Sequence, residues 1–324
     1  MANVELSEDI LASISVYANK MLHEVKLVLN TGNHEKRPEL SNFLASVASA
    51  SNNIVFEERD IGELVKGPIS FIIETNNGAT GITFSGIPSG HEFNSLILAI
   101  LQSGGVEIKL DQGLQTIIKN IDKTLNFEVF VSLGCQNCPE VVQALNEFAL
   151  LNKNITNEMI DGGLFQDIIK EKEISGVPSV YLNGELFANG RVETATLIEK
   201  LQRFSNTQSL ANSTTIETQD VVIAGGGPAG ISAAIYAARK GFKVTLIAQT
   251  IGGQLKDTMG IENFISVPKT TGPELSKALQ NHMNSYGITI KQNLSVSSIE
   301  NNDLKRIILS SGEIIESKTL IIAT

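Results

Sequence analysis

The only two cysteines of the chain, Cys135 and Cys138, lie where one regular sequence pattern ends and another begins. Residues 127–134 (FEVFVSLG) have the composition of a buried β-strand, and residues 139–152 (PEVVQALNEFALLN) have the apolar spacing of an amphipathic helix. A disulfide that closes so short a loop adds little stability through loop entropy. We therefore expect an α/β domain that carries a reactive cysteine pair, or half of a metal site, at a strand-to-helix turn.

The residues that follow complete a recognisable order of elements. The patterns predict a strand, a helix, a hairpin turning at Asn183-Gly184 and a last helix, in ITNEMIDGG, FQDIIKEKEI, VPSVYLNGELFANGR and residues 192–204. The order βαβαββα, with a CxxC at the first strand-to-helix turn, is that of the thioredoxin fold.

The N-terminal third repeats this plan without cysteines. LVLNTG followed by Asn33-His34-Glu35-Lys36 takes the place of FVSLG and the CxxC, and GPISFII takes the place of GVPSVYL. We predict two tandem thioredoxin-like domains, residues 1–117 and 118–203. A chance likeness between two unrelated α/β domains stays open, because strand-to-helix turns often carry glycine.

A helix over residues 5–23 is expected to begin the first of these domains. Its apolar residues recur at helical spacing and are expected to face the core: Leu6, Ile10, Ile14, Tyr17 and Met21.

The last third has a different pattern. Residues 204–219 are rich in Ser, Thr, Asn and Gln, which predicts a flexible linker. DVVIAGGGPAGISAAIYAARKGFKVTLIA then reads as strand, glycine-rich turn, helix and strand. In this context Gly225 permits the tight turn, Gly227 lets a pyrophosphate approach the backbone and Gly230 lets the helix pack on the strand. We predict that residues 220–324 are part of a Rossmann-like domain; a tight turn without a ligand is the alternative.

Charge and hydropathy narrow the function classes. The net charge is −10 and the sequence pI is about 5.0, which argues against nucleic acid or an anionic membrane as the main partner. No apolar run is long enough to span a bilayer, and the first ten residues (MANVELSEDI) lack a signal-peptide pattern. We expect a cytoplasmic protein.

The cysteine pair suits disulfide exchange. A thiolate is the attacking species, and a helix N-terminus lowers the pKa of a thiol. Cys135 falls just before the helix, as a nucleophile should, and Cys138 is expected one turn inside, where it resolves the mixed disulfide. Pro178 is expected in the cis form opposite the CxxC. The alternatives are an inert pair or half a zinc site completed by His34, His91 or a second chain.

Glu92, in the segment GHEF, is a further candidate for a catalytic residue. If the two thioredoxin-like domains share a cleft, it lies near the dithiol and acts on proton transfer. The simpler interpretation, which the sequence alone favours, is a charge that caps a helix N-terminus.

The motifs together resemble a known family. GGGPAG, GGQL, IENFISVP and a terminal IIAT resemble the FAD domain of low-molecular-weight thioredoxin reductases. With SLGCQNCPEVVQALN, IDGG and GVPSVYLNG in front, the resemblance narrows to the F subunits of alkyl hydroperoxide reductases, a family of peroxiredoxin reductases. It runs from about residue 5 to the end.

This resemblance implies a route for electrons and a set of site residues. NADH reduces FAD, FAD reduces a C-terminal dithiol, and that dithiol reduces an N-terminal one, which reduces the peroxiredoxin component of alkyl hydroperoxide reductase. Cys135 and Cys138 match the N-terminal dithiol, and Glu92 matches an acidic residue near it. The positions that match FAD contacts are Gly225, Gly227, Pro228, Ala229, Gly230, Gly253, Gln254 and Asn263. Members of the family are homodimers.

Two departures from the family matter. Gln249 stands where the family has an acid that binds ribose; its neutral amide can still hydrogen-bond hydroxyls, but we expect it to contribute less than a carboxylate. The sequence as given also holds no second nucleotide fingerprint and no second CxxC. The resemblance therefore implies that residues 220–324 are the first segment of a discontinuous FAD-binding domain, and we expect no NADH-dependent turnover from the sequence alone. The alternatives to a flavoprotein reductase are a stand-alone electron carrier reduced by an external reductase, and a non-enzymatic interaction or metal-binding module.

Overall fold

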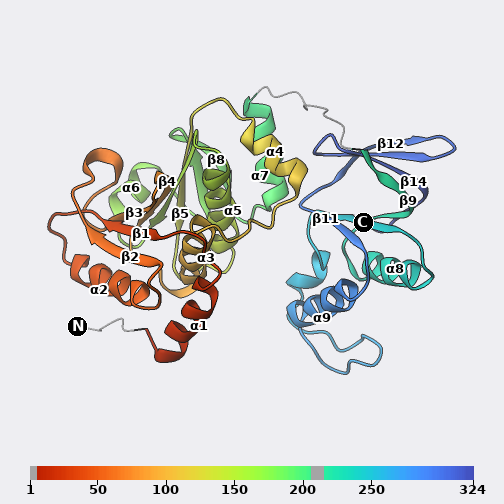
Figure 1. The fold of residues 1–324 in the computed structure, drawn as a ribbon, viewed down its shortest axis with the longest axis horizontal. Helices are drawn as coiled ribbons and strands as arrows, with labels where there is room; N and C mark the ends of the chain where they lie inside the picture. Colours follow the sequence, from red (N-terminus) through yellow and green to blue (C-terminus); the bar gives the residue numbers. More distant parts are fainter. Residues whose placement is uncertain (1–5, 206–214) are drawn as a thin grey trace. The chain divides into compact units, whose positions relative to one another are not determined.

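The computed structural model describes residues 6–205 and 215–324 (Figure 1). These residues form two compact units. The N-terminal unit comprises the described residues up to Lys109 together with Ile118–Thr194, and the C-terminal unit comprises Leu110–Ile117 and the described residues from Ala195 onward.

The N-terminal unit contains two similar halves. The first half consists of α1 (Glu8–Ala18), β1 (Val25–Leu29), α2 (Arg37–Ala48), β2 (Ile54–Glu58), the 3-10 turn η1 (Gly62–Leu64), β3 (Ser70–Thr75), β4 (Gly78–Ser85), the 3-10 turn η2 (Gly90–Glu92) and α3 (Phe93–Ser103). The second half consists of β5 (Leu125–Val131), α5 (Cys138–Leu151), β6 (Ile155–Asp161), α6 (Gln166–Glu171), β7 (Ser179–Leu182) and β8 (Glu185–Asn189). The alternation of strands and helices follows the predicted order in both halves, except that the last helix predicted for the second half falls almost entirely in the C-terminal unit.

The two halves share one sheet. Its eight strands lie in the order β2-β1-β3-β4-β6-β5-β7-β8. The seam is a parallel pairing of β4 with β6, from Ile82 opposite Asn157 to Ser85 opposite Ile160. Because this pairing joins the halves into one compact unit, a domain boundary between residues 117 and 118 stays a prediction.

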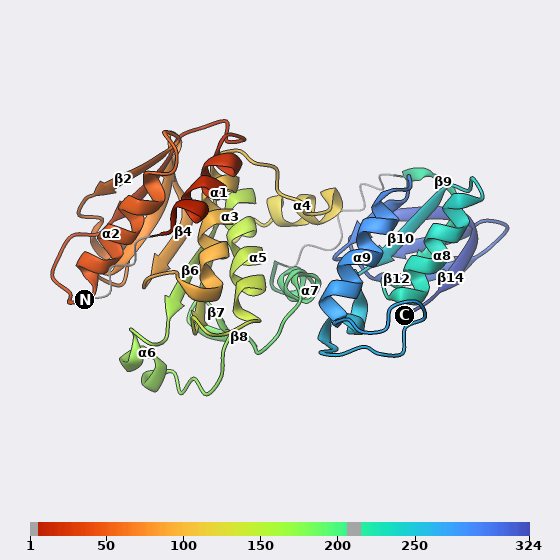
Figure 2. The same ribbon diagram turned by 90° about the horizontal axis from the view of Figure 1, so that it is seen from below.

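Helices α3 and α5 lie side by side over the central strands (Figure 2). The core of the unit is rich in fully buried phenylalanines, among them Phe71 and Phe84, whose rings stack with centroids 5.3 Å apart. A smaller cluster joins Ile168 and Ile169 of α6 to Phe130, Ile160 and Tyr181. Helix α5, which begins at Cys138, packs against β4, β5 and β6 in the middle of the sheet.

The first helix differs from its prediction. Ile14 and Met21 are buried as expected, but Ile10 is 38% exposed and Tyr17 is 53% exposed. Helix α1 ends at Ala18, so Met21 reaches the core from the following turn. The buried stripe therefore runs through Ile14 and Ala18 and leaves the neighbouring apolar residues at the surface.

The C-terminal unit contains a second sheet, with strand order β11-β10-β9-β14-β13-β12. Its strands are β9 (Thr215–Ala224), β10 (Val244–Ala248), β11 (Thr289–Gln292), β12 (Val296–Asn301), β13 (Lys305–Leu309) and β14 (Ile314–Ile322). The helical elements of this part of the chain are α4 (Gln112–Lys119), α7 (Thr194–Ser205), α8 (Pro228–Arg239), the 3-10 turn η3 (Gly253–Asp257) and α9 (Gly272–Asn284). The predicted first strand, helix and second strand are β9, α8 and β10, and the glycine-rich turn lies between β9 and α8. Strand β9 is parallel to β10.

The predicted linker, residues 204–219, overlaps a helix at its start and a strand at its end. Helix α7 continues to Ser205, and β9 already begins at Thr215, where it pairs with β14. The rest of the predicted linker, residues 206–214, lies outside the described residues. Within residues 6–205 and 215–324, no helix is long and apolar enough to cross a membrane.

Candidate functional site

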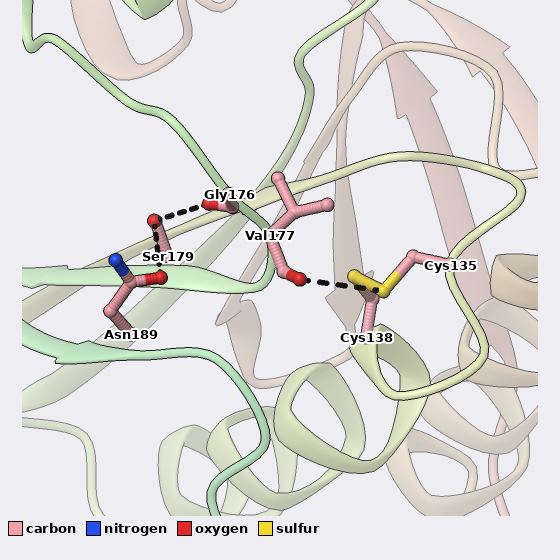
Figure 3. The surroundings of a disulfide bond; sticks show 6 residues. All are labelled: Cys135, Cys138, Gly176, Val177, Ser179 and Asn189. Carbon is pink, nitrogen blue, oxygen red and sulfur yellow. Dashed lines mark hydrogen bonds between the residues drawn. A yellow bond between two sulfur atoms is a disulfide. The ribbon is translucent and has the colours of Figure 1, made fainter.

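The two cysteines form a disulfide at the N-terminus of α5 (Figure 3). Cys135 lies in the loop before the helix and is half-buried, whereas Cys138 is 0% exposed. Helix α5 begins at Cys138, so the prediction that this residue lies one turn inside the helix is wrong. The N-cap residue Asn137 makes no side-chain capping bond, which leaves the positive end of the helix dipole to act on the sulfurs.

A loop from the end of α6 lies across from the disulfide. The Val177-Pro178 peptide bond is cis, as predicted, and the carbonyl oxygen of Val177 lies 3.9 Å from Cys135 Sγ (Figure 3). The hydroxyl of Ser179 donates a hydrogen bond to the carbonyl of Gly176 at 2.7 Å. Sequence reasoning singled out Pro178 but not Ser179, because a serine at the start of a strand carries no distinctive signal.

Glu92 lies at the end of η2, which packs on the loop leading to the dithiol. The N–H of His91 donates to the carbonyl of Leu133 at 3.1 Å, two residues before Cys135. A side chain at Gly90 would clash with the same carbonyl, since its Cβ would lie 2.6 Å from the oxygen. The two halves of the unit therefore meet here, and a cleft shared between them remains a prediction.

The side chain of Glu92 is not a helix cap. It stands at the N-cap position of α3 but makes no capping bond, and it is 0% exposed. Neither carboxyl oxygen has a hydrogen-bond partner among the described residues. Burial raises the pKa of Glu92 to about 7, and the nearby Ser95 hydroxyl opposes this only in part. The simpler interpretation that the sequence favoured is wrong.

In the part of the chain that the structure describes, no side chains stand ready to complete a zinc site with Cys135 and Cys138. No group of three or more His, Cys, Asp or Glu side chains stands ready to hold a metal there. His34 belongs to the turn before α2, where its Nδ1 accepts a hydrogen bond from the N–H of Lys36 at 3.1 Å.

The glycine-rich turn in the C-terminal unit has the predicted steric character. A Cβ on Gly225, whose φ is +127°, would lie 2.1 Å from the carbonyl oxygen of Ala323, and one on Gly230 would lie 2.0 Å from that of Gly225. At Gly227 a Cβ would meet nothing within 4 Å. The first and third glycines are thus needed for packing, while the second borders open space.

This open space suits a pyrophosphate. Gly227 is the N-cap of α8 and offers no side-chain bond, so the first N–H groups of the helix remain available to an anion. The Gly252-Gly253 turn lies against it: the N–H of Gly252 donates to the carbonyl of Gly226 at 2.8 Å, and a Cβ on Gly253 would lie 3.5 Å from the Cα of Gly227. The residues present therefore fit a dinucleotide at its phosphates.

The other residues predicted to contact the cofactor lie on separate segments after the glycine-rich turn. Gln249 follows the end of β10, Gln254 lies in η3, and both side chains are exposed. Asn263 is also exposed, in a segment closed by pairing of Ile261 with Thr270. The described contacts join Gly253 to the glycine turn but do not place Asn263 beside it.

Two family profiles match the chain. The thioredoxin domain matches residues 125–203, and the pyridine nucleotide-disulphide oxidoreductase family matches residues 219–324. The first covers the dithiol and the second covers the glycine-rich turn.

The whole chain is similar to longer proteins. It is 42% identical over 320 residues to the F subunit of alkyl hydroperoxide reductase from Staphylococcus aureus strain Mu50, which covers 98% of this chain and 61% of that protein. It is 40% identical over 319 residues to a protein of Ferdinandcohnia aciditolerans named NADH dehydrogenase, covering 98% of this chain and 60% of that one. The chain thus spans about three fifths of the length of these relatives.

A solved structure matches the N-terminal part over its full length. The NTD_N/C domain of alkylhydroperoxide reductase AhpF from Enterococcus faecalis is 35% identical, with a TM-score of 0.57, covering 60% of this chain and 99% of that domain. With the dithiol, the paired thioredoxin-like halves and the glycine-rich turn in the same order, the chain belongs to the AhpF family of alkyl hydroperoxide reductase proteins.

Proposed function

We propose that this chain carries the N-terminal dithiol of a flavoprotein that reduces the disulfide of a peroxiredoxin. The observation that carries the proposal is the disulfide between half-buried Cys135 and fully buried Cys138 at the uncapped N-terminus of α5. A structural staple would not need one accessible sulfur. The reaction belongs in the cytoplasm, where reductants keep such a pair in exchange.

The exposure of the two sulfurs assigns their roles. In the reduced chain, the thiolate of Cys135 attacks one sulfur of the partner disulfide, forms a mixed disulfide and releases one partner thiolate. The thiolate of Cys138 then attacks Cys135 Sγ, which restores the intrachain disulfide and releases the second partner thiolate. Two electrons pass to the partner, and each released thiolate takes up a proton.

We propose that Glu92 holds one of these protons. Its carboxyl is buried, the neighbouring residue His91 bonds to the loop that leads to Cys135, and the raised pKa of the Glu92 carboxyl, about 7, makes both protonation states accessible near neutral pH. We assign Glu92 the role of a proton donor and acceptor for the sulfurs, with Pro178 shaping the opposite wall of the site.

The glycine-rich turn of the C-terminal unit is proposed to hold FAD. The residues assigned to it are Gly225, Gly227, Pro228, Ala229, Gly230, Gly253, Gln254 and Asn263, with Gln249 near the ribose. Bound FAD would accept a hydride from NADH and supply electrons for disulfide reduction. The N–H groups at the start of α8 would bind its pyrophosphate.

A partner like the peroxiredoxin component of alkyl hydroperoxide reductase follows from the family. The alternative, a stand-alone carrier reduced by another protein, uses the same sulfurs and differs only in the electron source. Flavin absorbance of the purified protein separates the two. The homodimer remains a proposal, since the relatives are longer than this chain.

A trapping experiment tests the exchange step. Cys138→Ser removes the resolving sulfur, so the variant is expected to accumulate a mixed disulfide through Cys135 when it meets an oxidised peroxiredoxin. Cys135→Ser is the matched control and should trap none, because Cys138 is fully buried. Non-reducing gels and peptide mass spectrometry identify the linkage. Equal trapping by both variants would refute the assignment of roles.

A further inference from the structure

Three consecutive carbonyl groups face different partners beside the dithiol. The carbonyl of Gly176 accepts a hydrogen bond from the Ser179 hydroxyl at 2.7 Å, and the carbonyl of Pro178 accepts one from the N–H of Gly190 at 2.8 Å. The carbonyl between them, that of Val177, points at Cys135 Sγ from 3.9 Å (Figure 3). The two outer bonds fix the direction of the middle carbonyl, because they hold the loop on either side of it.

Ser179 makes a second contact that strengthens this arrangement. Its Oγ lies 3.2 Å from Oδ1 of Asn189, the last residue of β8 (Figure 3). A hydroxyl has one hydrogen to donate, so the shorter contact marks Gly176 as its acceptor. Turning the Asn189 amide by 180° brings its nitrogen to the hydroxyl as a donor and satisfies both groups. Ser179 itself is 2% exposed, whereas its two partners, Gly176 and Asn189, are exposed residues.

The direction of the Val177 carbonyl matters for the thiol. The 3.9 Å separation in the disulfide form puts this oxygen within reach of the S–H that Cys135 carries after reduction, and ionisation would remove such a bond and leave a negative sulfur beside a negative dipole end. A hydrogen bond made only by the neutral form raises the pKa of a thiol. The carbonyl thus opposes the effect of the α5 N-terminus, which favours the thiolate.

We propose that Ser179 is a positioning residue for the dithiol, which holds the Val177 carbonyl against Cys135 and so limits how readily this thiol ionises. The proposal rests on the redox function assigned to the pair above. Asn189 supports Ser179 in this role. Other titratable groups lie on the elements around the pair: Cys138 and Glu140 on α5, His91 and Glu92 on η2, and Asp161 at the end of β6.

The test is the pH dependence of Cys135 alkylation in the reduced full chain. Iodoacetamide reacts with the thiolate, and peptide mass spectrometry separates Cys135 from the only other cysteine. In Ser179→Ala we expect the midpoint for Cys135 to fall by about half a pH unit, which gives roughly threefold faster alkylation below the midpoint. Ser179→Thr keeps the hydroxyl and should restore the wild-type profile.

A matched control comes from the first half of the unit. Ser70 is the first residue of β3, as Ser179 is of β7, and it is 0% exposed, with its hydroxyl 2.7 Å from that of Ser85. Ser70→Ala removes a buried hydroxyl at the corresponding place and should leave the Cys135 profile unchanged. If Ser179→Ala does not fold, Asn189→Ala, at an exposed residue, is expected to shift the midpoint in the same direction by a smaller amount.

Two results would overturn the proposal: an unchanged midpoint in a folded Ser179→Ala or Asn189→Ala, or an equal shift in Ser70→Ala. Failure of Ser179→Thr to restore the profile would count against it as well. Failure of the underlying redox function looks different, because the wild-type disulfide would then resist reduction by dithiothreitol, or the reduced wild-type dithiol would fail to reduce any peroxiredoxin.

Discussion

Replacing Glu92 by glutamine should stabilise the N-terminal unit at alkaline pH and leave its stability almost unchanged at acid pH. The carboxyl is 0% exposed, and neither of its oxygens has a hydrogen-bond partner among the described residues. Its ionised form therefore loses hydration on folding, and the nearby Ser95 hydroxyl compensates for this loss only in part. Glutamine has nearly the same shape and cannot ionise.

The pH window follows from the raised pKa. Below pH 4.5 the carboxyl is protonated in the folded and the unfolded chain, so its ionisation costs nothing. Between pH 4.5 and about 7 the unfolded chain releases the proton while the folded chain retains it, and the folded state loses relative stability. Above pH 7 the loss is complete. A pKa raised from 4.5 to about 7 corresponds to about 3 kcal/mol.

The assay is denaturant unfolding of oxidised wild-type and Glu92→Gln chains at pH 4.5 and pH 8. Hydrogen-exchange mass spectrometry on peptides from β5 and β6 reports the N-terminal unit separately. We expect Glu92→Gln to be more stable than wild type by about 2–3 kcal/mol at pH 8 and equal to it within about 0.5 kcal/mol at pH 4.5. Glu140→Gln, at an exposed residue in the first turn of α5, serves as the control. The same difference at both pH values would refute the reasoning, because it would not arise from ionisation.

Two further predictions concern the C-terminal unit. Gly230→Ala should destabilise it by about 2 kcal/mol or more in thermal unfolding, because its Cβ would lie 2.0 Å from the Gly225 carbonyl oxygen, whereas Gly227→Ala should cost less than about 1 kcal/mol, since that Cβ meets nothing within 4 Å; equal losses would contradict the assignment of open space to Gly227. The 324-residue polypeptide mixed with NADH, a peroxiredoxin and peroxide should show no sustained NADH oxidation. Its only cysteines are Cys135 and Cys138, so it lacks the second dithiol that would carry electrons from FAD to this pair. Steady turnover in a spectrophotometric assay would contradict this.

Local patterns predicted most of the elements and the positions of the cysteines. Strand and helix periods are short-range signals, so β5, α5 and the glycine turn after β9 appear in the sequence almost as they fold. The roles of Gly225 and Gly230 could be predicted because a GxGxxG between a strand and a helix has a defined steric meaning.

The features that the sequence did not reveal depend on long-range packing. The pairing of β4 with β6 joins residues far apart in the chain, and no period indicates it. Glu92 has the position of a surface residue that caps a helix, and only the structure shows that its side chain is fully buried. Ser179 and Asn189 lie opposite each other in the β7–β8 hairpin. Only the structure shows that the Ser179 hydroxyl also bonds to the carbonyl of Gly176, the residue before Val177.

The most direct test of the redox role is a single-turnover measurement with the reduced chain. The protein is reduced, freed of reductant and mixed with an oxidised peroxiredoxin, and thiols on both proteins are counted by alkylation and mass spectrometry. We predict that one peroxiredoxin disulfide is reduced for each Cys135–Cys138 disulfide that forms. If the chain keeps both thiols while the partner stays oxidised, the dithiol is not the electron donor and the proposed function is wrong.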